Sequence, residues 1–543
     1  MNKRFFVGEA FLLRCLPLIL LGVLLISAMI TIFSQAGSYG ITIDEPIQDQ
    51  YGHAILEWYV TLGKDRSFLN FPPDTYMPEH GGIFDALVAG VQQAFPPAEH
   101  WQVRHLVTGL AGLIGVGGIA LCGYELGGYW YAFLAALALW CYPRYYGAIY
   151  NNPKDVPAAA ATTFMVWATL VLMRQWGQQK KTVRNSLLLG VCIGVAAAIR
   201  VNEVIWFLIL GLVALGWWVW HGRSIYQKRL VRKTIIKYLI AAGIIGMTSW
   251  LTMIALWPYI FLSPVKNLLH SIKVLSRYPW GGTVLYDGAV IPATRLPPTY
   301  TLKWLVIGSP PILIVFALLG LGMVGIWRIH KNGIDPKIAL ILLSLAVPLG
   351  AILGLHSVLY NGLRQFLFLA PSLILLAVYG FVQILKSLAT RKKQMLKLAA
   401  GGLAVLTLAS YVLVVKEMRA LSPFEYTYFS PVVGGLPGAV RNFESDYWRV
   451  CYAPATEWLA HNYLRYTQLS APTVGASDGP SLIMPDLPST FTYDATHPTF
   501  YIGNLIDPRD PKYPTYTIIH TVFVEGVPMC VVKVDPTSVR GER

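Results

Sequence analysis

Long apolar runs alternate with short polar segments along most of this chain. A helix of roughly 20 mostly apolar residues crosses the hydrocarbon core of a bilayer, so these runs predict membrane-spanning helices. We mark eleven of them, at residues 13–34, 103–123, 129–145, 157–173, 185–200, 203–220, 234–257, 305–327, 338–355, 365–385 and 398–415. The pattern therefore predicts an all-α polytopic membrane protein with about eleven transmembrane helices.

The longer polar stretches predict structure outside the membrane. Residues 35–102 show two amphipathic patterns separated by a proline-rich turn, which predicts two helices lying on the membrane surface. Residues 416–543 begin with a helical pattern at 453–463 and end in two alternating runs around Gly526, which predict a strand pair. We therefore expect a membrane domain at 1–415 and a small α/β domain at 416–543.

The distribution of charge predicts the orientation. The formal net charge is +15, and 55% of the residues are hydrophobic. If the N-terminus is cytoplasmic, the inner loops and adjoining helix ends contain 21 of the 43 Lys and Arg, including the basic runs Lys180-Lys181, Lys228–Lys233 and Arg391–Lys393. Basic residues prefer cytoplasmic loops, so membrane topology explains the charge and a nucleic-acid partner is not expected.

The same charge argument predicts the side of the membrane on which each end of the chain lies. With an odd number of passes, the C-terminus and the 416–543 domain are extracytoplasmic. A cleaved signal peptide is the alternative for residues 1–34, since SQAG at 34–37 weakly resembles a cleavage site. The apolar run is long for a signal peptide, so we expect a retained helix.

Polar residues that are costly near a membrane gather at the predicted outer ends of the helices, and such residues commonly mark a functional site. The adjacent carboxylates Asp44 and Glu45 follow the first apolar run directly. The full set is Asp44, Glu45, Arg144, Asn151, Asn152, Lys154, Asp155, Arg200, Asn202, Glu203, His356, Tyr360 and Arg364. A carboxylate in such a position is suited to act as a base.

Each of these residues also has a purely structural explanation. Glu45 completes a capping-box pattern that starts at Thr42, and Asp155 could cap the helix that follows it. Lys154 could extend to the interface as an anchor, and Arg200 and Glu203 could pair with each other. Arg364 has no acidic neighbour in the sequence, and its guanidinium matches the oxygens of a lipid phosphate.

Cysteines and familiar catalytic motifs add little. Cys451 and Cys530 both lie in the extracytoplasmic segment, where a disulfide between them is chemically permitted. The histidines His53, His80 and His105 have no metal-ligand spacing in the sequence, so we expect no metal site and no required cofactor, although a divalent metal stays open. The chain also contains no nucleotide-binding loop of the GxxxxGK[ST] type.

Five polar segments of the chain lie on the same predicted side of the membrane. Their sequence and order resemble those of the GT-C glycosyltransferases, in particular the bacterial relatives of the protein O-mannosyltransferases (glycosyltransferase family 39) and the aminoarabinose-lipid A transferases. The matching pieces are IDEP at 43–46, RYYGAIYNNPKDVP at 144–157, LPPTYTLKW at 296–304, YNGLRQFLFLAP at 360–371 and FEYTYFSPVVGGLPGAVRNFESDYW at 424–448. The SDYW at 445–448 differs from the WWDYG-type signature of oligosaccharyltransferases, which argues against Asn-linked oligosaccharide transfer.

The resemblance implies an inverting glycosyltransferase that takes a sugar from a polyprenyl-phosphate donor at the outer face of a bacterial inner membrane. Asp44 would be the general base, and Glu45 and Asp155 would orient Asp44 or the sugar hydroxyls. The implied substrate-binding residues are Lys154, Asn152, Arg144, Arg200, His356, Tyr360 and Arg364. The acceptor, which could be a glycan, a lipid or a protein, and the sugar itself stay open. The alternative is a transporter or lipid flippase with a path through Asp44, Glu203 and Arg364.

Overall fold

The computed structural model describes residues 3–96, 99–177, 182–222, 228–331, 334–390, 392–505 and 512–538. Three members of the basic runs, Lys180, Lys181 and Arg391, lie outside these ranges.

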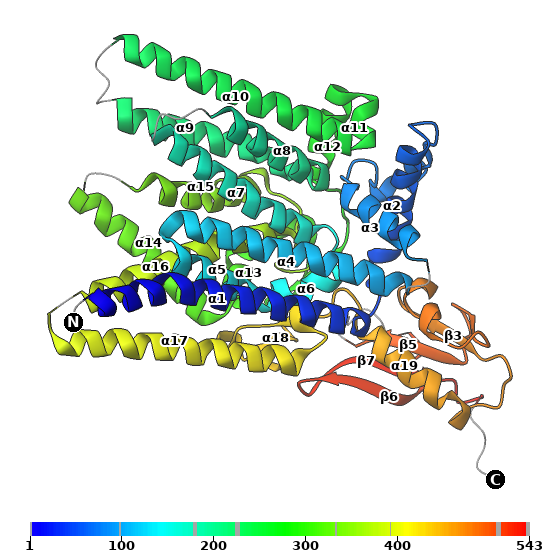
Figure 1. Ribbon diagram of the computed structural model, residues 1–543. Coiled ribbons are helices and arrows are strands. Elements are labelled where there is room, and N and C mark those ends of the chain that lie inside the picture. Colours follow the sequence, from blue (N-terminus) through cyan, green and yellow to red (C-terminus); the bar gives the residue numbers. More distant parts are fainter. Residues whose placement is uncertain are drawn as a thin grey trace.

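A bundle of long helices makes up most of the molecule (Figure 1). Its helices are α1 (Lys3–Gln35), α4 (His100–Gly127), α5 (Tyr129–Trp140), α7 (Asp155–Gly177), α8 (Val183–Ile199), α9 (Trp206–Gly222), α10 (Lys228–Leu256), α14 (Pro311–Lys331), α15 (Pro336–Leu355), α16 (Ala370–Ala389) and α17 (Gln394–Leu421). Within the described residues, seven helices are long and apolar enough to cross a membrane, and four further apolar helices are shorter. Each apolar segment of the sequence overlaps one of these helices, which confirms the polytopic all-α fold.

Proline residues divide two of the expected segments. The predicted helix 129–145 ends at Trp140, and a separate helix α6 (Pro143–Asn151) follows it. The predicted helix 305–327 is divided into α13 (Thr299–Ile307) and α14, which begins at Pro311. Proline has no N–H to donate within a helix but fits its first turn, so each proline starts a new helix.

Glycines allow the bundle helices to approach closely. A Cβ atom on Gly118 of α4 would lie 2.0 Å from Thr163 Oγ1 of α7, and one on Gly380 of α16 would lie 2.2 Å from the Phe316 carbonyl oxygen of α14. Neither position has room for a larger residue. Small residues have this role in membrane helix packing, where close van der Waals contact holds helices together.

The segment between α1 and α4 lies beyond the end of the bundle (Figure 1). As expected, it forms two helices, α2 (Glu45–Val60) and α3 (Ile83–Ala94). A second outer segment contains α11 (Pro258–Leu262), α12 (Pro264–Ser276) and a hairpin of β1 (Thr283–Tyr286) with β2 (Ala289–Pro292). The sequence analysis did not predict this hairpin.

The C-terminal segment forms a five-stranded sheet that lies beyond the N-terminal end of α4 and the C-terminal end of α17 (Figure 1). The strand order is β4 (Thr492–Tyr493), β3 (Thr473–Ala476), β5 (Phe500–Asn504), β7 (Val527–Val534) and β6 (Thr517–Val524). The helix α19 (Tyr452–Asn462) and the β6–β7 hairpin agree with the sequence-based prediction. A disulfide joins Cys451 at the start of α19 to Cys530 in β7, with Cα atoms 5.8 Å apart.

Candidate functional site

Arg364 is the meeting point of three chain segments. It begins a short 3₁₀ turn (Arg364–Leu369) that leads into α16. Its Nη2 contacts the carboxylate of Asp44, the residue directly before α2. Its Nε donates a hydrogen bond to Asp155 Oδ2, on the first residue of α7, at 3.3 Å. One guanidinium therefore joins two carboxylates that are far apart in the sequence.

Asp155 holds a second cation as well. Arg200 Nη1 lies 2.9 Å from Asp155 Oδ1, and Asp155 is only 2% exposed. Among the described residues the ion pair of Arg200 is with Asp155 and not with Glu203, which accepts a long hydrogen bond from Asn202 Nδ2, at 3.4 Å. A buried carboxylate that is shared by two guanidinium groups fixes the position of both.

Asn152 caps the start of α7. Its Oδ1 accepts hydrogen bonds from the backbone N–H groups of Lys154 and Asp155 at 3.3 and 2.9 Å, and its Nδ2 donates to Asp155 Oδ2 at 2.8 Å. The interpretation of Asp155 as the cap of this helix was therefore wrong. The side chain of Asn152 does that work, which leaves the Asp155 carboxylate to face the cations.

Lys154 adds a third positive group at the same place. Its side chain is buried, and within the described part of the chain its ammonium has no hydrogen-bond or ion-pair partner. Burial lowers the pKa of Lys154, and the cations Arg200 and Arg364 act in the same direction, whereas Asp85 and Asp44 oppose the shift. An anion that binds here would oppose this downward shift.

His80 lies near these cations too. Burial lowers the pKa of the His80 imidazole well below its ordinary value, and the positive charges of Lys154, Arg200 and Arg364 add to that shift. From the sequence, His80 was only one of three histidines without metal-ligand spacing. No local spacing links position 80 to these three residues, so only the fold reveals the proximity.

A cavity of about 310 Å³ opens in front of Asp44 and Arg364. It is lined by Ile43, Asp44, Tyr278, Trp280, Thr283, Leu285, Val290, Tyr360, Asn361, Arg364, Glu444, Ser445, Tyr447 and Arg449. Its wall includes aromatic rings: the ring centroids of Trp280 and Tyr360 lie 4.2 Å apart, and the two ring planes form an angle of 32°. The cavity thus combines a carboxylate, fixed cations and aromatic surfaces.

The two adjacent carboxylates have different environments. Asp44 lines the cavity, its side chain is 33% exposed, and it makes no capping hydrogen bond to α2. Glu45 is fully buried and accepts hydrogen bonds from the N–H and Oγ1 of Thr42 at 2.8 and 2.9 Å. It also lies 3.2 Å from His105 Nε2 and 3.7 Å from Arg104 Nε. The capping-box reading explains Glu45, whereas Asp44 is free of that role.

Two other candidate residues lie away from the cavity. The guanidinium carbon of Arg144 is 4.8 Å from the ring centroids of both Trp304 and Phe429, and its Nε donates to the Tyr428 carbonyl at 2.9 Å. Arg144 is therefore packed between aromatic rings, which is a structural contact. His356 is exposed at the end of α15, in a left-handed backbone conformation with φ of 51°.

The C-terminal domain supplies cavity residues that the sequence analysis did not single out. Arg449 pairs with Asp478 at 2.9 Å. Glu444 accepts a hydrogen bond from the backbone N–H of Asn361 at 2.9 Å. Both lie in or next to the motif at 424–448, which carried the family resemblance, but the motif alone gave no reason to assign either residue to the site.

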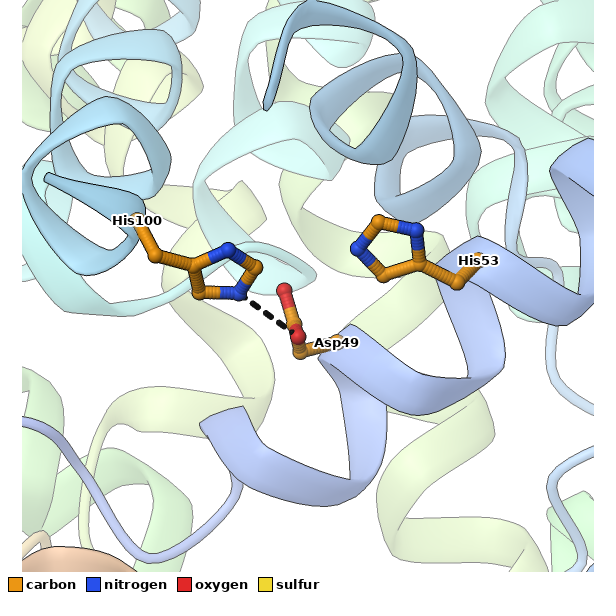
Figure 2. A group of neighbouring side chains, drawn as sticks. All are labelled: Asp49, His53 and His100. Carbon is orange, nitrogen blue, oxygen red and sulfur yellow. Dashed lines mark hydrogen bonds and ion pairs between the residues drawn. The ribbon is translucent and has the colours of Figure 1, made fainter. Parts of the chain in front are cut away.

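Possible metal ligands gather at two places among the described residues, and neither includes Asp44. One group is Asp446, Cys451 and Cys530, whose two sulfur atoms are already joined to each other. The other is Asp49, His53 and His100, whose candidate ligand atoms lie within 4.8 Å of one another (Figure 2). No metal site was expected from the sequence, where only His53, His80 and His105 were considered; His100 lies 47 positions after His53.

Comparison with known proteins identifies the fold. No family model and no curated protein sequence matches this chain. Among solved structures, the oligosaccharyltransferase of Archaeoglobus fulgidus is 12% identical, with a TM-score of 0.50 over 84% of this chain and 62% of that chain. The same archaeal enzyme in complex with an inhibitory peptide and a dolichol-phosphate aligns with the same TM-score and identity. ArnT from Cupriavidus metallidurans, bound to undecaprenyl phosphate, covers 95% of this chain and 98% of that chain at a TM-score of 0.44.

At such low identity the likeness to the archaeal enzyme shows a shared fold, and this chain spans about 62% of the length of that enzyme. This agrees with the fold that the sequence resemblance implied.

Proposed function

We propose that this protein is an inverting glycosyltransferase that moves a sugar from a polyprenyl-phosphate donor to an acceptor hydroxyl at the outer membrane face. The observation that carries the proposal is the contact of Arg364 with Asp44 and Asp155 on the wall of a partly aromatic cavity. The fold shared with an enzyme whose structure contains a dolichol-phosphate supports the same substrate class.

Asp44 is the proposed general base. In the reaction, its carboxylate takes the proton of the acceptor hydroxyl while that oxygen forms a bond to the anomeric carbon. The bond between the anomeric carbon and the phosphate oxygen breaks at the opposite side, and its electron pair leaves with the polyprenyl phosphate. The anomeric configuration is therefore inverted. Arg364 would hold the Asp44 carboxylate at the cavity wall through the contact described above.

Lys154, Arg200 and Arg364 are the proposed phosphate-binding residues. Arg364 uses Nη2 and Nε for the two carboxylates, and its Nη1 has no hydrogen-bond partner among the described residues. The unpaired ammonium of Lys154 is a second donor. Fixed cations favour the leaving phosphate most strongly when its charge increases in the transition state, so they would accelerate bond breaking.

The cavity favours a small sugar headgroup over a long glycan. Ligand pockets span roughly 300–1,000 Å³, and this cavity, at about 310 Å³, lies at the lower end of that range. Its aromatic walls suit the apolar faces of a sugar ring, and Glu444 and Arg449 offer polar groups for hydroxyls. Together with the SDYW sequence at 445–448, this size argues for a single hexosyl or pentosyl group.

We further propose that the protein resides in a bacterial inner membrane with a cytoplasmic N-terminus and an extracytoplasmic C-terminal domain. The concentration of Lys and Arg in the inner loops supports this orientation. In this orientation Asp44, Arg364 and the cavity face outward, toward a donor in the outer leaflet. We infer no required cofactor, because the phosphate leaving group can be held by side-chain cations alone.

Purified protein in nanodiscs, incubated with a panel of polyprenyl-phosphate sugars and with extracts of cell-surface acceptors, tests the proposal. The expected result is release of free polyprenyl phosphate from one donor, detected by mass spectrometry. A second expected result is transfer of the sugar to an acceptor with inverted anomeric configuration. If no donor is consumed and proteoliposomes carry out proton-coupled flux, the protein is a transporter and the proposal is wrong.

A further inference from the structure

Asp49, His53 and His100 face one another on the outer segment before the bundle (Figure 2). Asp49 and His53 lie one turn apart on α2, and His100 is the first residue of α4. Figure 2 shows one ring nitrogen of His53 directed toward the gap between the His100 ring and the Asp49 carboxylate. His100 Nε2 lies 2.8 Å from Asp49 Oδ2.

A simple ion pair between His100 and Asp49 does not explain His53. Among the described residues, His53 has no hydrogen-bond or ion-pair partner, and its ring faces that of His100 with centroids 6.0 Å apart and planes 15° apart. Two imidazole rings beside one carboxylate do not stabilise each other unless a cation lies between them. Two histidines and one carboxylate are, by contrast, a common ligand set for zinc.

The neighbouring side chains orient the proposed ligands. Gln92 Nε2 donates to Asp49 Oδ1 at 3.2 Å and to the backbone carbonyl of His100 at 3.0 Å. Arg104 Nη1 donates to the same Oδ1 atom at 3.4 Å. Both bonds hold the carboxylate through one oxygen, so Oδ2 stays directed at the histidines. Hydrogen bonds of this kind are typical around metal ligands, because they fix the orientation of the first coordination sphere.

The local charge also favours a cation. Arg104 faces three carboxylates, namely Asp49, Asp85 and Glu45, and Lys154 offsets part of the negative charge at Asp85. Two cations thus stand against three carboxylates. The site is accessible, because the His100 side chain is 43% exposed and that of Asp49 is 12% exposed. A tetrahedral zinc ion with bonds of about 2.0–2.2 Å needs ligand atoms closer than 4.8 Å, so side-chain shifts of about 1 Å would complete the site.

We propose that Asp49, His53 and His100 bind one divalent transition metal ion, best matched by Zn²⁺, with water in the fourth position. The ion joins α2 to the start of α4. Asp44 directly precedes α2, and five residues of helix, about 7.5 Å, separate it from Asp49. The metal therefore has a positioning role for the segment that presents Asp44, and it lies outside the cavity.

Metal analysis of the full-length protein in nanodiscs tests this proposal independently of the proposed function, because the measurement needs no donor or acceptor. The protein is stripped with a chelator, titrated with Zn²⁺ and Co²⁺, and desalted. We expect about one ion per chain, a Co²⁺ absorption band typical of tetrahedral coordination, and a higher Tm with Zn²⁺. His53→Ala should lose at least tenfold in affinity and lose the rise in Tm.

The matched control is His497→Ala, which removes an exposed histidine from the C-terminal domain and should bind metal as the wild type does. His53 makes no hydrogen bond to the described residues, so its replacement should leave the fold intact, which size-exclusion chromatography checks. Failure of the wild type to bind either ion, or equal binding by wild type and His53→Ala, would overturn the proposal. Enzyme activity without metal binding would reject this site and leave the proposed function standing.

Discussion

The guanidinium of Arg364 contacts the carboxylate of Asp44 across 320 residues of sequence and holds Asp155 with its other edge. This arrangement gives Arg364 two roles in the proposed reaction. It fixes the position of the base, and its remaining N–H groups are available for the donor phosphate. Both roles depend on the several N–H groups of a planar guanidinium, which the compact ammonium of a lysine does not have.

Arg364→Lys should therefore lower kcat/KM for the lipid-linked donor by roughly tenfold or more, about 1.4 kcal/mol. The ammonium cannot contact Asp44 and Asp155 in the planar geometry of the guanidinium. Steady-state kinetics with the donor measures the effect. Arg277→Lys, an exposed change on the same outer face, is the control and should leave the kinetics unchanged. If Arg364→Lys has wild-type kinetics, Arg364 does not bind the donor phosphate and only anchors the helix end at the membrane interface.

Asp155→Asn should destabilise the protein by about 3 kcal/mol, because it removes the buried carboxylate that the partly buried guanidinium groups of Arg200 and Arg364 share. The measurement is denaturant or thermal unfolding in nanodiscs. Asp287→Asn removes an exposed carboxylate that pairs with Lys303, and it should cost at most about 1 kcal/mol. Equal stability losses in the two variants would show that Asp155 is not a buried hub.

Glu425 should make the protein less stable as the pH rises from about 4.5 to about 7. Burial raises the pKa of Glu425 to about 7 in the folded protein, against an ordinary value of 4.5. The folded state therefore binds a proton more tightly than the unfolded state, and this contribution is present below pH 4.5 and is lost as the pH rises through 7. The full effect is up to about 3 kcal/mol.

Glu425→Gln keeps an acceptor for the Tyr39 hydroxyl, which donates to Glu425 at 2.9 Å, and carries no charge. Its Tm relative to that of the wild type should rise between pH 5 and pH 8. Glu457→Gln, an exposed change on α19, serves as the control and should show no such trend. A Tm difference that is independent of pH would contradict the assignment of this titration to Glu425.

The disulfide between Cys451 and Cys530 closes a loop of 79 residues and should stabilise the C-terminal domain by about 4 kcal/mol. The double variant Cys451→Ala, Cys530→Ala should unfold at correspondingly lower denaturant concentration. Peptide mapping after thiol labelling of unreduced, denatured protein checks the bond directly. Label on both residues would refute it, whereas label on Cys15, Cys122, Cys141 and Cys192 is expected.

The sequence predicted the helices well because burial in a bilayer demands long apolar runs, and these are visible locally. The β6–β7 hairpin was predictable for a similar reason, since its alternation and its turn at Gly526 are local features. The β1–β2 hairpin was not predicted, because its strands are only four residues long and give too short a pattern.

The site was predicted less completely. Asp44, Asp155, Arg200 and Arg364 were found because charged residues are costly at helix ends, but their pairing depends on helix packing, which the sequence does not reveal. For the same reason Arg144 was assigned to a site from which the fold separates it, and the three ligands of the proposed zinc site were not seen together.

The rate of polyprenyl phosphate release by Asp44→Asn tests the central claim most directly. The amide keeps the size of the carboxylate but cannot accept the acceptor's proton. With a donor that the wild type consumes, we expect the variant to release polyprenyl phosphate more slowly by a factor on the order of 10²–10⁴. Its affinity for the donor should differ from that of the wild type by less than about threefold. Glu57→Gln, the same change at an exposed position on α2, should behave as the wild type. An Asp44→Asn rate within threefold of the wild-type rate would contradict the assignment of Asp44 as the base.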